Sequence, residues 1–101
     1  MIVGFDWDDG NLPKCLKHGV SQEEIEDVFR HAFHLSPDLA HSQAETRFLA
    51  IGSGGGQRPV FVVFTLRRGG DGDYIRPISA RYMHLKERRA YEAAIAPPDD
   101  G

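Results

Sequence analysis

Residues 58–67 read Arg-Pro-Val-Phe-Val-Val-Phe-Thr-Leu-Arg, and this stretch decides the fold. Its apolar side chains follow one another without polar residues between them, so both faces of an extended strand here are apolar. A strand of that kind belongs at the centre of a sheet, with helices covering at least one face. Glycine-rich segments at 52–56 and 69–72 bound the stretch and predict turns on either side of it. We therefore expect a central strand that pairs with a neighbour through each turn.

The neighbouring strands are predicted at residues 45–52 and 74–81, where apolar and β-branched residues lie between turn-forming segments. Pro77 lies inside the second of these strands. Because proline has no amide hydrogen to donate, we expect it at a sheet edge or a bulge. Residues 2–7 predict a further short strand, whereas the polar segment 35–44, with its Ser-Pro-Asp sequence, predicts a turn or loop.

Three helices complete the pattern. Residues 12–18 predict a short helix that has proline in its first turn and ends at Gly19. Ser21 and Glu24 form a capping box, which predicts the start of a second helix that ends near residues 31–34. Residues 83–95 predict a third helix. The order β-α-α-β-β-β-α predicts an α+β fold, a small antiparallel sheet with helices packed on it.

The length and composition of the chain limit its architecture. With 101 residues, we expect a single domain over residues 1–96 and a disordered tail at 97–101. Cys15 is the single cysteine, so an intramolecular disulfide framework is excluded. The longest apolar run is too short to span a membrane, and the first residues do not resemble a signal peptide. These features predict a cytoplasmic protein with no membrane association.

The net charge of −3 is unevenly distributed along the chain. Residues 1–45 carry nine acidic and three basic side chains, whereas residues 46–96 carry nine basic and four acidic ones. This asymmetry predicts a basic face in the C-terminal half that holds a phosphate backbone, and we favour RNA as the ligand.

Five short motifs occur in order along residues 2–95. They are FDWD at 5–8, KHGVS at 17–21, ETRFLAIG at 45–52, VVFT at 62–65 and ISAR at 78–81. Together they resemble the BrnT toxin family. The chain departs from that family at Lys14, where the family commonly carries an asparagine.

The resemblance implies a RelE-like fold and a bacterial ribonuclease toxin of a type II toxin–antitoxin pair. Such a toxin cleaves RNA, inhibits translation, and is neutralised by a cognate BrnA-like antitoxin in a hetero-oligomer. The antitoxin carries the DNA-binding domain, so operator DNA is contacted only through it. The pair is expected to repress its own operon.

RNA cleavage without a metal or other cofactor needs a base for the 2′-hydroxyl, cations for the phosphate and an acid for the 5′-oxygen. The family-like motifs contain residues of these chemical types, namely Lys17, His18, Glu45, Arg47 and Arg81. The expected products are a 2′,3′-cyclic phosphate and a 5′-hydroxyl. The general base stays open among His18, Glu45 and Lys17. Arg81 is our first candidate for binding the phosphate, because a guanidinium can donate hydrogen bonds to two phosphate oxygens at once.

Each of these residues also has a structural interpretation. His18 could pack beside Gly19 and bond a carbonyl at the helix end, and Lys17 could be an ordinary surface lysine. Glu45 and Arg47 lie two positions apart and so on one face of a strand. On a solvated surface they could form an ion pair worth less than about 1 kcal/mol.

Further RNA contacts are expected around the second hairpin. Arg67, Arg68 and Arg76 would extend a basic track along the RNA backbone, and Tyr82 would stack a base. The alternative for the three arginines is protection of the sheet edge against strand-to-strand aggregation.

No metal site is expected. Cys15 with His18, and His31 with His34, have helical spacing, but nothing in the sequence makes the two pairs converge.

A second class of function also fits the sequence. The chain could be a catalytically silent module that binds the antitoxin, within a complex that acts as a DNA-binding transcriptional autorepressor.

Overall fold

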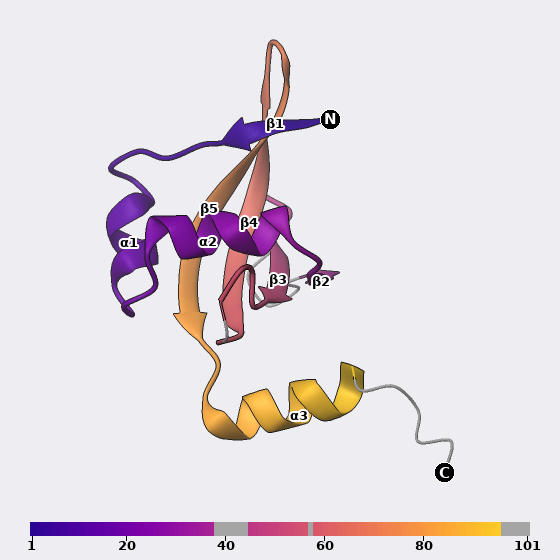
Figure 1. Ribbon diagram of the computed structural model, residues 1–101. Coiled ribbons are helices and arrows are strands. Elements are labelled where there is room, and N and C mark those ends of the chain that lie inside the picture. Colours follow the sequence, from indigo (N-terminus) through magenta and orange to yellow (C-terminus); the bar gives the residue numbers. More distant parts are fainter. Residues whose placement is uncertain (38–44, 57, 96–101) are drawn as a thin grey trace.

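A computed structural model describes residues 1–37, 45–56 and 58–95, and its α+β class confirms the predicted class. Within these ranges the chain forms five strands and three helices (Figure 1). In chain order they are β1 (Ile2–Phe5), α1 (Leu12–Leu16), α2 (Gln22–Arg30), β2 (His34–Pro37), β3 (Phe48–Gly52), β4 (Val60–Gly69), β5 (Gly72–Tyr82) and α3 (Leu85–Ile95). The predicted tail at 97–101 and most of the predicted loop at 35–44 lie outside the described residues.

The strands form one sheet in the order β1-β5-β4-β3-β2, so β4 is central, as the apolar stretch predicts. The predicted element order is wrong in one place, because His34–Pro37 forms the edge strand β2. This strand pairs antiparallel with β3, from His34 opposite Ile51 to Pro37 opposite Phe48. All four of its side chains are exposed, so its pairing depends on backbone hydrogen bonds, which the polar sequence does not predict.

The sheet is mixed, which corrects the prediction of an antiparallel sheet. β1 runs parallel to β5, with Ile2 opposite Asp73 and Phe5 opposite Ile75. The two strands are some 70 residues apart in sequence, and their relative direction depends on a long connection that local sequence patterns do not specify. β1 covers only the first part of β5, and α1 packs beside the rest of that strand (Figure 1).

The helical predictions are confirmed. Ser21 Oγ accepts a hydrogen bond from the Glu24 amide at 3.0 Å, and the Glu24 carboxylate accepts one from the Ser21 amide at 3.2 Å. Gly19 has a φ of +87°, the left-handed conformation expected where α1 ends. In the described ranges, no helix is long and apolar enough to cross a membrane.

α2 covers one face of the sheet and forms the core with it (Figure 1). Ile25 and Val28 of α2 are buried in the same cluster as Ala50, Val62 and Ala80, which pair across three strands. Because side chains alternate along a strand, the residues between them project from the opposite face. We call this second side the open face, defined by Leu49, Phe61, Val63, Ser79 and Arg81.

β5 contains a bulge at the predicted proline. Val63 pairs with Ser79, but the next residue, Phe64, pairs with Pro77, so Ile78 is the extra residue in β5. The Pro77 carbonyl accepts a hydrogen bond from the Asn11 side chain at 2.8 Å. Proline is therefore accommodated at a bulge, as expected.

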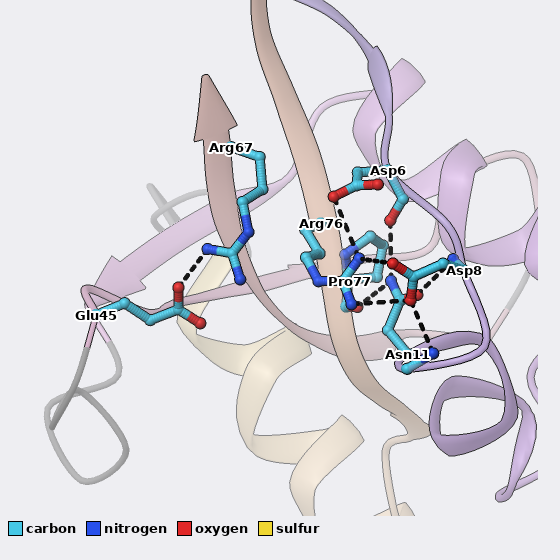
Figure 2. A network of polar contacts seen from close by, with 8 residues as sticks. Asp6, Asp8, Asn11, Glu45, Arg67, Arg76 and Pro77 are labelled. Atoms are coloured by element: carbon cyan, nitrogen blue, oxygen red, sulfur yellow. Dashed lines mark hydrogen bonds and ion pairs between the residues drawn. The ribbon is translucent and has the colours of Figure 1, made fainter. Parts of the chain in front are cut away.

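The Asn11 side chain is almost fully buried and joins three backbone segments. Its amide nitrogen donates to the carbonyls of Asp6, at 2.9 Å, and Pro77, and its oxygen accepts from the Asp8 amide at 2.8 Å. It thereby fastens the exit of β1 and the start of α1 to the bulge in β5 (Figure 2).

We predict that Asn11→Ala destabilises the protein by about 1–3 kcal/mol, because it leaves buried backbone groups without partners. The free energy of unfolding, measured in urea, tests this. The exposed Lys14, three positions further on, provides the control variant Lys14→Ala, which should change stability little. Equal stability of the two variants would contradict the role assigned to Asn11.

Candidate functional site

A cleft of about 410 Å³ lies on the open face, at the end of the sheet where β5 finishes. Its floor is apolar and its rim carries a cation and an imidazole. The lining residues are His18, Leu49, Phe61, Val63, Ser79, Ala80 and Arg81. The structure thus brings two of the predicted catalytic residues, His18 and Arg81, to one cleft.

Arg81 is positioned by the pairing of β4 with β5. It lies opposite Phe61, and its guanidinium carbon is 4.6 Å from the centre of that ring. Both of its terminal nitrogens donate to the Glu87 carboxylate in the first turn of α3, at 2.8 and 2.9 Å. Such a fork onto two oxygens is also the geometry with which arginine binds phosphate.

Glu87 was not among the predicted site residues, although it joins α3 to the sheet. Besides pairing with Arg81, its carboxylate accepts a hydrogen bond from the His84 amide at 2.9 Å, as a helix cap. The Arg81 hydrogen bonds, followed by that of the amide, lower the pKa of Glu87 to about 2. Glutamate three residues after a helix start is a recognisable signal, so the capping role could have been found from sequence.

His18 reaches the cleft because α1 ends just before it. Lys17 still has helical backbone angles, Gly19 turns the chain, and Val20 is buried in the core. This leaves His18 exposed at the rim. Lys17 is also exposed but does not line the cleft.

A smaller hollow of about 270 Å³ adjoins the cleft and shares His18 and Arg81 with it. Arg58, Tyr82, Met83 and His84 form the remainder of its lining. Tyr82, a predicted RNA contact, is thus beside the cleft. Arg58 and His84 were not predicted from the sequence as site residues. Arg58 reaches Tyr82 because the strand register places Val60 opposite Tyr82, and this register cannot be read from the local sequence.

Glu45 and Arg67 form a second group on the same sheet. Their side chains make a close ion pair, drawn in Figure 2. The hydrogen bond from Arg67 lowers the pKa of Glu45, and the charge of Arg47 contributes to the shift. Arg67 is six residues from Phe61 along β4, a distance of roughly 20 Å in a strand. Glu45 therefore lies well away from His18, and its partner is Arg67 and not only the neighbouring Arg47.

Two further predicted RNA contacts differ in accessibility. Arg76 is 16 % exposed and donates to two carboxylates, to Asp6 at 3.2 Å and to Asp8 at 2.9 and 3.0 Å (Figure 2). Its first function is therefore to hold the segment after β1 against β5. Arg68, in contrast, is 89 % exposed, and its nearest carboxylate oxygen, on Asp73, is 3.7 Å away.

The structure does not bring together the two residue pairs with helical spacing, Cys15 with His18 and His31 with His34. Cys15 is completely buried, and burial raises the pKa of its thiol to about 11. The ring of His31 bonds the Asp27 carbonyl at 2.9 Å, whereas that of His34 packs edge-on against Tyr91. Among the residues that the structure describes, no three His, Cys, Asp or Glu side chains gather as a metal site would require.

Comparison with known protein families gives a match over most of the chain. A family model described as "Ribonuclease toxin, BrnT, of type II toxin-antitoxin system" matches residues 7–87, most of the chain. The matched span runs from Trp7, just after β1, to Glu87, and so contains the residues that line both hollows. A search of curated proteins found no match.

We predict that the contact between Arg81 and Glu87 is lost only in strong acid. Because folding lowers the pKa of Glu87 to about 2, the pair contributes fully above about pH 4.3, the ordinary glutamate value. Its contribution then falls as the pH drops toward 2. The carboxyl ¹³C shift of Glu87, followed by NMR, should titrate near pH 2, and Arg81→Ala should move the midpoint upward. Titration at the ordinary value in the unmodified protein would refute the pair.

Proposed function

Because the chain belongs to the BrnT family of ribonuclease toxins of type II toxin–antitoxin systems, we propose that it is a metal-independent endoribonuclease. It cleaves RNA, inhibits translation, and is neutralised by a BrnA-like antitoxin that alone contacts operator DNA. The main observation that supports this proposal is the cleft that both His18 and Arg81 line. We further propose that the mixed sheet is a variant of the RelE-like fold.

In the proposed reaction, Arg81 binds the scissile phosphate. Two non-bridging oxygens of the phosphate replace the two oxygens of Glu87 on the guanidinium fork. Negative charge grows on these oxygens as the 2′-oxygen attacks, so the fork stabilises the transition state more than the ground state. The apolar floor around Phe61 and Val63 strengthens this attraction by excluding water.

His18 is the proposed general base. It removes the proton of the 2′-hydroxyl, whose oxygen then forms a bond to phosphorus as the bond to the 5′-oxygen breaks. The departing 5′-oxygen takes up a proton from water, which leaves a 2′,3′-cyclic phosphate and a 5′-hydroxyl. Glu45 is a weaker candidate, because its ion pair with Arg67 lowers its pKa, and hence its basicity, and lies far along the sheet. Lys17 is assigned an electrostatic role beside the cleft.

The remaining predicted residues would bind the flanking RNA backbone. Phe61 and Arg67 are separated by an even number of residues on β4, so both project from the open face. A strand of RNA leaving the cleft along this face would meet Arg47, which precedes Phe48 opposite Phe64, and then Arg67. The exposed Arg68 projects from the opposite face and would contact RNA that passes around the hairpin. Arg76 would contribute charge, but its carboxylate partners limit direct contact.

The neutralisation of Arg81 and Arg76 by carboxylates favours the second candidate function. A silent module that binds only the antitoxin would keep both guanidiniums permanently paired. In that case the complex with the antitoxin would act as the transcriptional repressor, and the chain alone would have no activity.

Incubation of the purified protein with labelled RNA distinguishes the two functions. We predict cleavage that persists in EDTA, with 2′,3′-cyclic phosphate and 5′-hydroxyl ends on the fragments. Loss of cleavage in EDTA would contradict the metal-independent mechanism. An unmodified protein that binds its antitoxin but cuts no RNA and causes no growth arrest would favour the silent module.

Arg81→Ala should reduce the rate of cleavage by about 10²–10³-fold, the usual effect of removing a group that stabilises transition-state charge. Arg88→Ala is a matched control, because Arg88 is a nearby arginine that pairs with Glu92 on the surface of α3. The control should cleave RNA at nearly the normal rate. The same two variants should differ in growth arrest, and equal effects of both would contradict the role of Arg81.

A further inference from the structure

Beside the cleft, an arginine is stacked on a tyrosine. The guanidinium carbon of Arg58 is 3.7 Å from the centre of the Tyr82 ring. We propose that the free plane of Arg58 is the platform on which one RNA base stacks, the base next to the scissile phosphate. This inference rests on the proposed ribonuclease function and names the part of the substrate that the second hollow binds.

Tyr82 is held rigidly in place under Arg58. Its hydroxyl donates to the carboxylate of Glu24, which is itself fixed by the capping box of α2. Its backbone lies in β5, opposite Val60 of the central strand. The ring therefore has one anchor on the sheet and another on a helix, and it cannot turn to stack a base by itself. In this proposal Arg58, which covers the ring, stacks the base in place of the predicted Tyr82.

Arg58 itself offers the remaining surface. A guanidinium is flat and stacks on aromatic rings through either plane, so contact with Tyr82 leaves its second plane available. Arg58 is exposed, and it lines the 270 Å³ hollow that shares His18 and Arg81 with the cleft. This volume is below the range of about 300–1,000 Å³ typical of sites for drug-sized ligands, and suits a single nucleotide.

The charges around Arg58 favour a base over a phosphate. On its other side, Arg58 lines a hollow of about 330 Å³ that also contains the carboxylates of Glu24 and Asp27. The hydrogen bond from Tyr82 is the main cause of the lowered pKa of Glu24, and the positive charge of Arg58 adds to it, so Arg58 and Glu24 interact electrostatically. An RNA phosphate at Arg58 would meet these carboxylates, whereas one at Arg81 would take the place of Glu87 on the guanidinium fork. The backbone is therefore directed to Arg81 and the base to Arg58.

The position of the platform gives it a function in catalysis. Arg58 and Arg81 contact the same hollow, so a base on one and its phosphate on the other belong to the same or adjacent nucleotides. Stacking would restrict rotation of the ribose and hold its 2′-hydroxyl toward His18. Arg58 is thus a positioning residue for the proposed reaction and is not expected to touch the reacting atoms.

Binding of an RNA oligomer that cannot be cleaved tests the platform. A fluorescent oligomer with 2′-O-methyl groups on every ribose lacks the attacking hydroxyl, and a fully abasic oligomer of equal length lacks the bases. Arg58→Lys keeps the charge and removes the flat stacking surface. We predict that it weakens binding of the oligomer with bases about tenfold and leaves binding of the abasic oligomer unchanged.

Arg88→Lys is the matched control and should affect neither oligomer, because Arg88 lies on α3 and pairs with Glu92. Thermal unfolding should show that both variants are folded. Equal weakening of the two oligomers by Arg58→Lys would mean that Arg58 binds the backbone, and no weakening of either would remove it from the site. Either result overturns the proposal.

The experiment separates this proposal from the ribonuclease proposal. Base-dependent binding that Arg58→Lys abolishes, in a protein that cuts no RNA, would sustain the platform and refute the ribonuclease. Efficient cleavage by a protein whose binding is insensitive to Arg58→Lys would support the ribonuclease and refute the platform. A failure of the unmodified protein to bind either oligomer would overturn both.

Discussion

The antiparallel pairing of β4 with β5, interrupted by one bulge, is the constraint on which the site depends. Arg76 and Arg81 are five residues apart and would project from opposite faces of a regular strand. The extra residue Ile78 restores them to the same face, and it also puts Pro77 and Ala80 together on the face that α2 covers. The same register places Arg81 on Phe61 and brings Tyr82 beside Val60. Without the bulge, Pro77 and Arg76 would exchange faces relative to Ala80 and Arg81, so the core would lose Pro77 and the open face would lose Arg76.

The bulge also explains which parts of the fold the sequence could predict. Features that depend on a few neighbouring residues, such as the capping box at Ser21 and the central apolar strand, are confirmed. Pro77 indicates a bulge or edge because its ring removes one backbone donor. The strand at His34–Pro37 and the parallel direction of β1 depend on partners distant in sequence, and their own residues carry no sign of these partners. For the same reason His18 and Arg81 were identified through a family resemblance, and Arg58 was missed.

The uneven charge of the chain has a structural meaning that composition alone does not reveal. Three of the carboxylates that pair with the basic half come from the acidic half: Asp6 and Asp8 with Arg76, and Glu45 with Arg67. These contacts join the start of the chain to the hairpin of β4 and β5. Part of the asymmetry that predicts a phosphate-binding face therefore stabilises the fold. Arg67, Arg76 and Arg81 lie on the open face, but each is partly neutralised by a carboxylate before any ligand arrives.

Arg81 differs from Arg76 in the number of its carboxylate partners and in its own exposure. Glu87 comes from the basic half of the chain, lies in the first turn of α3, and keeps about a third of its side chain exposed. Figure 1 shows α3 beyond the end of the sheet, where Arg81 and the packing of Tyr91 on His34 hold it. Arg76, in contrast, has two partners and is mostly covered, and releasing it would detach the segment after β1. Because solvent screens an exposed pair and phosphate offers the same two oxygens with at least as much charge, exchange of a ligand for a carboxylate costs less at Arg81 than at Arg76. Of these two arginines, Arg81 is therefore the one that can bind a substrate without loosening the sheet.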